Sequence, residues 1–147
     1  MQLLRTAANI GASEADLKQI YFQYVRPILE SSCQVWSGSL TSQNMIDLER
    51  CQKSAVKVIV QHYTNYENSL KYLNIQSLKD RFKTLTLKMA RQIKNHPKFE
   101  HFFKPNEKIH KMKLRKSKVL HENIFFTERY KKSPILYMQR LLNENMN

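Results

Sequence analysis

The sequence predicts an all-α protein: a small bundle of about five helices, followed by a basic, partly extended tail with a short terminal helix. Two observations lead to this fold class. The chain has only two glycines in 147 residues, and a β-rich domain normally needs more of them in its turns. Apolar residues also recur at helical spacing, and helix-capping residues precede most of these segments.

The first two helices are expected on either side of Gly11. Residues 2–10 form a short helix that Gly11 can end. Ser13 and Asp16 then form a capping box, which satisfies backbone N–H groups that have no partner in the helix. The apolar residues that follow at helical spacing are Leu17, Ile20, Tyr21, Tyr24, Ile28 and Leu29. Pro27 lies inside this helix, where a proline costs about 3 kcal/mol because it removes a hydrogen bond and crowds the preceding turn.

Two further capping residues predict the next helices. Thr41 caps a helix with a long apolar stripe. The residues of this stripe are Met45, Leu48, Gln52, Ala55, Val56 and Ile59. Thr64 and Glu67 repeat the capping-box spacing and open a shorter helix.

The clearest helix is expected to begin behind Ser77, which has Asp80 three residues further on. Its apolar face consists of Leu78, Phe82, Leu85, Met89 and Ile93. The sequence Asn95-His96-Pro97 ends the helix, because the residue before a proline avoids helical geometry.

The composition divides the chain after residue 103. Residues 1–103 are expected to form a helical domain. Residues 104–147 carry 11 basic and 4 acidic side chains, a net charge of +7. Within them, residues 104–132 are predicted to be a basic arm and residues 133–144 a terminal helix, which begins with Ser133 as N-cap and Pro134 at its first position.

The charge of the chain indicates an anionic partner. Lys and Arg outnumber Asp and Glu by 25 to 12, which gives a net charge of +13. Nucleic acid is the simplest partner of this kind, and a membrane surface or an acidic protein is a lesser option. Because no apolar run is long enough for a signal peptide or a membrane span, we expect an intracellular protein, nuclear or cytoplasmic.

The residues that catalysis would need are missing from the sequence. The only aspartates, Asp16, Asp47 and Asp80, are too widely spaced to form a paired site for two magnesium ions. Two isolated glycines cannot form a phosphate-binding loop, and the histidines show no metal-ligand spacing. We therefore predict no catalytic residue, metal or cofactor. One catalytic alternative stays open, a Cys–His pair that the fold assembles from Cys33 or Cys51.

Candidate nucleic-acid-binding residues lie on two helices and on the arm. On a helical wheel Lys83, Arg91 and Lys94 fall opposite the apolar face of the clearest helix, where they could follow a phosphate backbone. Leu87 lies among them and suggests contact with something absent from this chain. Lys53 and Lys57 form a similar pair on the preceding long helix. The candidates on the arm are Lys111, Lys113, Arg115, Lys116 and Lys118. The alternative for each is an ordinary solvated surface.

Four segments together resemble the carboxy-terminal thumb and post-thumb region of reverse transcriptases from non-LTR retrotransposons (LINE elements) of the jockey and chicken-repeat type. These segments are DLKQIYFQYVRPILESSCQVWSGSL (16–40), LERCQKSAVKVIV (48–60), YLNIQSLKDRFKTLTLKMARQIKNHPKFEHFF (72–103) and TERYKKSPILYMQRLLNE (127–144). The chain departs from the family pattern at Ser31-Ser32 and at Ile59-Val60-Gln61, where glycines are usual.

The resemblance implies a truncated protein that lacks the fingers, the catalytic palm and the endonuclease. Such a remnant would be no enzyme on its own, and would bind RNA or an RNA–DNA duplex without sequence specificity. The resemblance also implies a kinked helix at Pro27, with Trp36 as a core anchor. An apolar surface that faced the palm would be bare and open to self-association, with Leu87 as a member. The alternative function is a small basic helical module that binds an acidic protein and has no nucleic-acid role.

Overall fold

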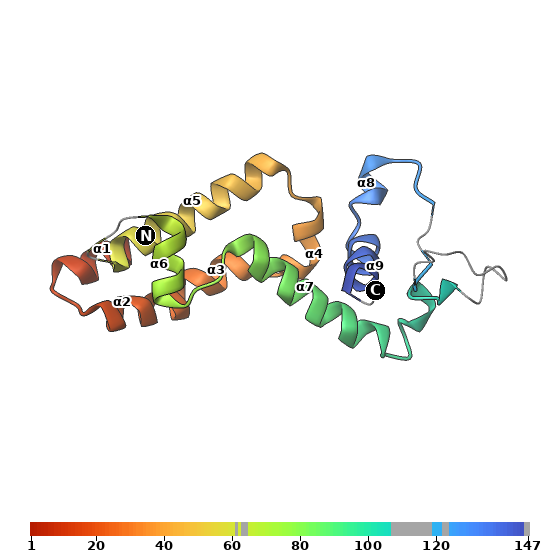
Figure 1. Cartoon of the computed structure of the whole chain (residues 1–147), viewed down its shortest axis with the longest axis horizontal. Coiled ribbons are helices and arrows are strands. Elements are labelled where there is room, and N and C mark those ends of the chain that lie inside the picture. Colours follow the sequence, from red (N-terminus) through yellow and green to blue (C-terminus); the bar gives the residue numbers. More distant parts are fainter. Residues whose placement is uncertain (61, 63–64, 107–118, 122–123, 146–147) are drawn as a thin grey trace. The chain divides into compact units, whose positions relative to one another are not determined.

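The structure is a computed structural model that describes residues 1–60, 62, 65–106, 119–121 and 124–145. It confirms the all-α fold class, because the extended pairing within these residues is limited to one isolated bridge between Pro105 and Leu120 (Figure 1). The α-helices are α1 (Gln2–Asn9), α2 (Glu14–Ile20), α3 (Arg26–Glu30), α4 (Cys33–Trp36), α5 (Ser42–Ile59), α6 (Tyr66–Leu73), α7 (Leu78–Lys94), α8 (Glu128–Lys131) and α9 (Pro134–Asn145). A π-helical turn, η1 (Tyr21–Val25), and two 3-10 turns, η2 (Ser37–Ser39) and η3 (Glu100–Phe102), complete the elements.

The chain forms two compact units, each with its own apolar core. The first consists of Met1–Ser32 and Leu40–Arg81, and the second of Cys33–Ser39 and Phe82–Asn147. The domain boundary after residue 103 that the composition suggests lies within the second unit and stays a prediction.

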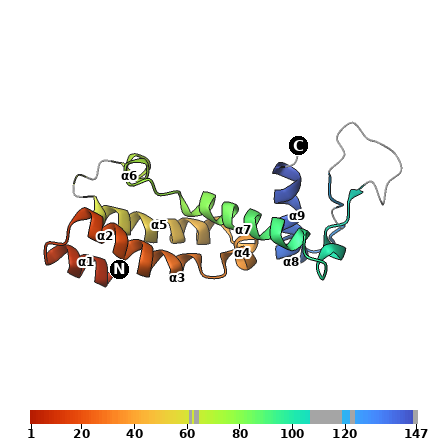
Figure 2. The same cartoon turned by 90° about the horizontal axis from the view of Figure 1, so that it is seen from below.

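The core of the first unit lies between α5 and the helices α1, α2 and α6, which pack against it. Figure 2 shows α5 running alongside α1 and α2. The buried residues of this cluster are Leu4, Leu17, Tyr21, Ala55, Val56, Ile59, Val60, Leu70, Leu73 and Ile75. Leu17 and Tyr21 of the predicted stripe lie in this core together with residues of the α5 stripe, as the amphipathic pattern predicts. Tyr24 and Ile28, which the same stripe placed on the apolar face, are exposed, so this part of the prediction is wrong.

Most of the predicted helix starts are confirmed by side-chain hydrogen bonds. Ser13 and Asp16 form the complete capping box. Thr41 Oγ1 accepts a hydrogen bond from the backbone N–H three residues on, at 3.2 Å. Ser77 Oγ accepts one from the N–H of Asp80, also at 3.2 Å. These contacts span three residues, and a sequence pattern can therefore predict them.

The predicted start of α6 at Thr64 is wrong. The N-cap of this helix is Asn65, and Thr64 lies outside the described residues. The helix ends at Asn74, which has a left-handed conformation with φ of 53°. Asparagine tolerates this conformation better than most residues, so it takes the C-terminal place that glycine often occupies.

The chain around Pro27 contains a π-helical turn. Residues Tyr21–Val25 form this turn, and the N–H of Arg26 donates to the carbonyl of Tyr21, five residues earlier. Pro27 follows directly, in the first turn of α3, where it lacks an N–H group. Prolines and π turns are both recognised causes of helix irregularity. The irregularity that the resemblance implies is thus present as a widened turn, and the Pro27 side chain itself is exposed.

The core of the second unit lies along the carboxy-terminal part of α7. Its buried residues are Ala90, Phe103, Leu120, Met138 and Leu142, and Leu87, Met89 and Ile93 pack against them. The prediction that Leu87 stands among cations on a bare surface is therefore wrong. The wheel assigned α7 a single apolar stripe, whereas side chains from distant parts of the sequence extend its buried face to Leu87 and Ala90.

The turn η2 packs closely on α9 within the second unit. A Cβ atom added to Gly38 would lie 2.7 Å from Tyr137 Cγ. The neighbouring Trp36 makes an edge-to-face contact with Phe82, with ring centroids 5.2 Å apart. Trp36 is half-buried. Only a residue without a side chain fits at position 38, because a heavy-atom approach below 3 Å is repulsive.

Candidate nucleic-acid interface

The helix α7 carries the candidate cations that the structure describes best. Ser77 caps its first turn, and Glu49 Oε2 accepts a hydrogen bond from the N–H of Leu78 at 3.1 Å. An anionic side chain at a helix N-terminus is favourable because the N–H groups there carry partial positive charge. The start of the helix is thus held by both a neutral and an anionic acceptor.

Four cations of α7 lie beyond Phe82, in the second unit. Lys83, Lys88 and Arg91 are exposed, and Lys94 is half-buried. At 1.5 Å per residue, Lys83 and Lys94 are about 16 Å apart along the helix axis. Consecutive phosphates of one DNA strand are about 3.4 Å apart along the duplex axis. The cations therefore extend over the length of several phosphates, with Lys83, Arg91 and Lys94 on one side of the helix and Lys88 about 140° around the helix from Lys83.

Lys83 is already paired within the second unit. Its Nζ lies 3.2 Å from Glu144 Oε2, and both side chains are about half-exposed. Exposed pairs of this kind contribute roughly 0–1 kcal/mol, because water screens them and two flexible side chains lose freedom. A phosphate could therefore compete with Glu144 for this lysine at small cost.

Lys88 was missed by the sequence analysis. The helical wheel was centred on Phe82 and Met89, whereas Thr86 and Ala90 are fully buried. The Oγ1 atom of Thr86 lies 3.3 Å from the Oγ atom of Ser37, within hydrogen-bonding distance. A threonine is as compatible with a solvated face as with such a contact. The sequence therefore gave no clear indication that the buried face of α7 includes Thr86 and Ala90.

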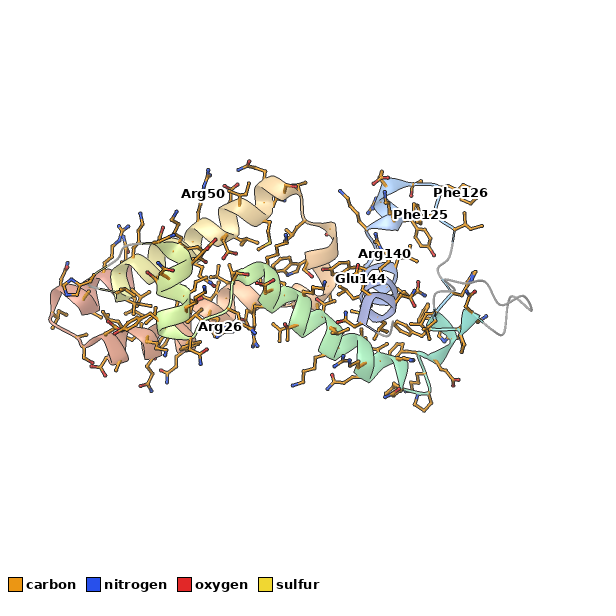
Figure 3. The ribbon with its side chains drawn as sticks, in the orientation of Figure 1. Arg26, Arg50, Phe125, Phe126, Arg140 and Glu144 are labelled. Atoms are coloured by element: carbon orange, nitrogen blue, oxygen red, sulfur yellow. The ribbon has the colours of Figure 1, made fainter. Side chains whose placement is uncertain are left out.

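The candidates on α5 lie in the first unit. Lys53 and Lys57 are both exposed and stand one turn apart, as the spacing predicts. Arg50 precedes them on the same side of the helix, and its Nη1 pairs with Asp47 Oδ1 at 2.8 Å (Figure 3). The cations of α5 belong to the first unit and the four cations of α7 beyond Phe82 to the second, so the two sets form separate surfaces.

The candidates on the basic arm lie outside the described residues. They are Lys111, Lys113, Arg115, Lys116 and Lys118. Their predicted role therefore stays a prediction from the sequence alone.

Two arginines of the first unit are engaged in a partly buried ion-pair network. Arg26 Nε lies 2.5 Å from Glu30 Oε1, and Arg81 Nε lies 3.0 Å from the same atom. Burial by itself raises the pKa of Glu30, but the hydrogen bonds from Arg81 and Arg26 outweigh it and hold this pKa below its usual value. Because their charge is compensated, these arginines are poorer phosphate ligands than the exposed cations.

Two sequence expectations concern metal ligands and cysteine chemistry. No three His, Cys, Asp or Glu side chains within this set are grouped so that they could hold a metal ion. Cys33 is buried, whereas Cys51 is exposed on α5. A nucleophilic thiol must reach its substrate, so the Cys–His alternative would need Cys51.

None of the described helices is both long and apolar enough to cross a membrane.

Comparison with known proteins reveals no relative of this chain: no family model, curated protein or solved structure matches it. The origin that the four sequence segments suggest is therefore a proposal.

Proposed function

We propose that this chain is a non-catalytic remnant of the reverse transcriptase of a non-LTR retrotransposon, an RNA-directed DNA polymerase, and that it binds a duplex of RNA or of RNA and DNA. The four ordered segments that resemble the thumb and post-thumb region support the origin. The net charge of +13 supports the binding. Under this proposal the helices correspond to the thumb and the segment beyond it, and the contacts are to phosphates, which set position and affinity without reading sequence.

The four cations of α7 beyond Phe82 are the observation that carries the binding proposal. Lys88 and Arg91 are exposed, and within the described part of the chain neither forms an ion pair. Among the described residues, Lys83 forms an ion pair with Glu144, whose side chain is also exposed. Each cation that neutralises a phosphate releases condensed counterions, so these cations would give affinity that falls steeply with salt.

The test is the affinity of the full chain for a labelled RNA–DNA hybrid, measured by fluorescence anisotropy at about 50 and 200 mM salt. We expect binding at the lower salt and a loss of orders of magnitude at the higher. The double variant Lys88→Ala/Arg91→Ala should lower the slope of log K against log salt by about two, because each lost phosphate contact removes about 0.9.

A matched control separates local contacts from total charge. Arg5 and Lys71 are exposed residues of the first unit, and Arg5→Ala/Lys71→Ala removes the same charge as the α7 variant. We expect this control to keep the salt slope of the original chain. Equal effects of the two variants, or no binding at either salt, would refute the proposed role of α7.

A protein-interaction module is the second candidate function. The exposed side chains of Tyr24 and Ile28 favour it, because they stand one turn apart on the same side of the chain. A polyglutamate chain that competes with the hybrid at equal charge concentration would favour this alternative. A duplex preference at equal charge would favour the nucleic-acid role.

A further inference from the structure

Aromatic side chains stand in water where the chain leads into α8. Phe126 is 94% exposed, and Phe125 and Tyr130 are also exposed. Figure 3 shows Phe125 and Phe126 beside α8 in the second unit. A packed phenylalanine buries roughly 150 Å² of surface or more. The exposed rings therefore leave a large apolar surface in contact with water. Exposed apolar clusters of this kind commonly mark binding surfaces.

Cations are interleaved with these aromatic residues. Lys131 Nζ lies 5.5 Å from the centroid of the Phe125 ring, a cation–π geometry. Arg129 and Lys132 are exposed, and within the described residues neither has an ion-pair partner. We call Phe125, Phe126, Arg129, Tyr130 and Lys132 the aromatic–basic patch. Its charge complements an anionic ligand, and its rings complement a flat one.

An open cavity of about 460 Å³ adjoins this patch, and Arg129, Tyr130 and Lys132 of the patch help to line it. Its lining residues are Ser39, Thr127, Arg129, Tyr130, Lys132, Ser133 and Pro134, and the surface that they expose to the cavity is mainly apolar. The volume falls within the range of roughly 300–1,000 Å³ that is usual for small-molecule sites. Phe126 precedes the lining residue Thr127 in the chain but does not itself line the cavity, and its ring stands in water.

Several contacts within the second unit hold the patch in place. Thr127 Oγ1 caps α8 by accepting a hydrogen bond from the N–H of Tyr130 at 3.2 Å. Arg140 donates from Nη2 to the carbonyl of Lys131, which ties the end of α8 to α9. The close approach of Gly38 to α9 brings the neighbouring Ser39 to the cavity. The patch thus belongs to a packed part of the unit.

We propose that the aromatic–basic patch binds unpaired nucleotides. Phe126 stacks on a base, while Arg129 and Lys132 contact the phosphates beside it. In a duplex both faces of each internal base are covered by its neighbours, so only an unpaired base can stack on this ring. Recognition of this kind tolerates any base, since every base has a π-face. The inference deepens the proposed function and rests on it, because it presumes that the chain binds nucleic acid.

The lining of the cavity favours nucleotides over a lipid surface. A membrane-binding aromatic residue inserts into a broad interface beside basic residues. Here the cations Arg129 and Lys132 both line one concave site. Two cations beside a mainly apolar hollow fit a nucleotide, which joins an anionic phosphate to a base with apolar faces.

The test compares two RNA–DNA hybrids that differ only in an RNA extension of about six unpaired nucleotides. Anisotropy at about 50 mM salt gives the affinity of the full chain for each. We expect the extension to tighten binding and Phe126→Ala to remove about 5- to 150-fold of that gain, the range measured for one base–aromatic stack. Phe126→Trp should retain the gain, because tryptophan also stacks.

The matched control is Phe99→Ala, which truncates another exposed phenylalanine of the second unit, 41% exposed. It should leave the gain from the extension unchanged. A second readout is the fluorescence of 2-aminopurine in the extension, which stacking quenches. We expect Phe126→Ala to abolish the quenching. Arg129→Ala/Lys132→Ala should weaken binding of the extension and lower its salt slope, which provides a test that does not alter the rings.

The outcomes separate this inference from the proposed function. If the blunt hybrid binds and the extension adds nothing, the inference is wrong and the duplex proposal stands. If neither hybrid binds, both are wrong. An equal loss in Phe126→Ala and Phe99→Ala would also overturn the inference. The inference would also be wrong if binding to vesicles of phosphatidylserine and phosphatidylcholine depended on Phe126 while binding of the extension did not.

Discussion

The Oη atom of Tyr21 donates a hydrogen bond to Gln52 Oε1 at 2.8 Å, in the core of the first unit. The amide nitrogen of Gln52 donates in turn to Tyr66 Oη at 3.0 Å and to the carbonyl of Gln76 at 2.9 Å. One side chain of α5 thus connects three other segments. Gln52 occupies a position of the predicted apolar stripe, and it can be buried because its polar atoms are paired.

We predict that Gln52→Leu lowers the free energy of unfolding by about 2–4 kcal/mol. The substitution keeps apolar volume but leaves the hydroxyl of Tyr21 without its acceptor, and each unsatisfied buried group costs roughly 1–3 kcal/mol. Urea denaturation followed by circular dichroism measures the change. Gln19→Leu, at an exposed position of α2, is the control and should shift stability little. An equally stable Gln52→Leu variant would show that the network contributes no net stability.

We predict that stability falls as the pH rises from 10 to about 12. Burial raises the pKa of Tyr21 to about 12, whereas a tyrosine in the unfolded chain titrates near 10, its typical value. Below pH 10 both states are neutral at this group and its contribution is fully present. Above pH 10 Tyr21 ionises first in the unfolded state, and this ionisation stabilises the unfolded state. The free energy of unfolding therefore falls by about 2 kcal/mol as the pH approaches the folded pKa.

The pKa of Tyr66 is also raised above its usual value, first by burial and second by the hydrogen bond to Glu49. Urea denaturation at several alkaline pH values measures both effects. Because lysines also titrate in this range, the control is Tyr21→Phe, which should be less stable at neutral pH but lose less stability on going to alkaline pH. Parallel curves for the variant and the original chain would contradict the assignment.

We predict that Gly38→Ala destabilises the second unit by about 1–3 kcal/mol, the usual cost of overpacking. The added Cβ would meet Tyr137 Cβ at 2.8 Å, and an atom so near the backbone cannot rotate away. A double-mutant cycle with Tyr137→Ala isolates the part of the contact that the ring makes: alanine keeps Cβ but removes Cγ and Cδ1, so the two substitutions should be less than additive. Additive effects in thermal unfolding would show that the strain lies elsewhere.

We predict self-association through the surface formed by Tyr24, Pro27 and Ile28. Ile28 is 77% exposed, and all three side chains are exposed at the π turn and α3. In the proposed parent enzyme such a surface could contact the palm, and a second copy would cover it here. Sedimentation velocity over a concentration series should show a dimer that Ile28→Glu dissociates.

Ile10→Glu is the control for this prediction, because Ile10 is similarly exposed, at 81%, but belongs to the end of α1. It should leave the dimer intact. A monomer at every concentration would contradict the prediction. Leu87, which the helical wheel placed on such a surface, is excluded because it packs in the core of the second unit.

The exposure of the candidate cations was largely predictable. Lys53, Lys57, Lys83 and Arg91 are exposed, since charged side chains rarely leave water unless they are paired. Lys94 is half-buried, and the wheel did not indicate this. The aromatic residues interleaved with charge from Phe125 to Lys132 favoured a hydrophobic anchor on the domain over base stacking, because aromatic side chains are more often buried. In the structure Phe126 stands in water.

The sequence by itself determined the all-α class and where most helices begin. Ser13, Thr41 and Ser77 each act on a backbone group only three residues away, and such local contacts depend on little else. Only the tertiary structure decided which side of α7 is buried, how Gln52 is paired and why position 38 must be glycine. Gly38 meets Tyr137 across almost a hundred residues of chain, and such a contact arises from packing that no local pattern encodes.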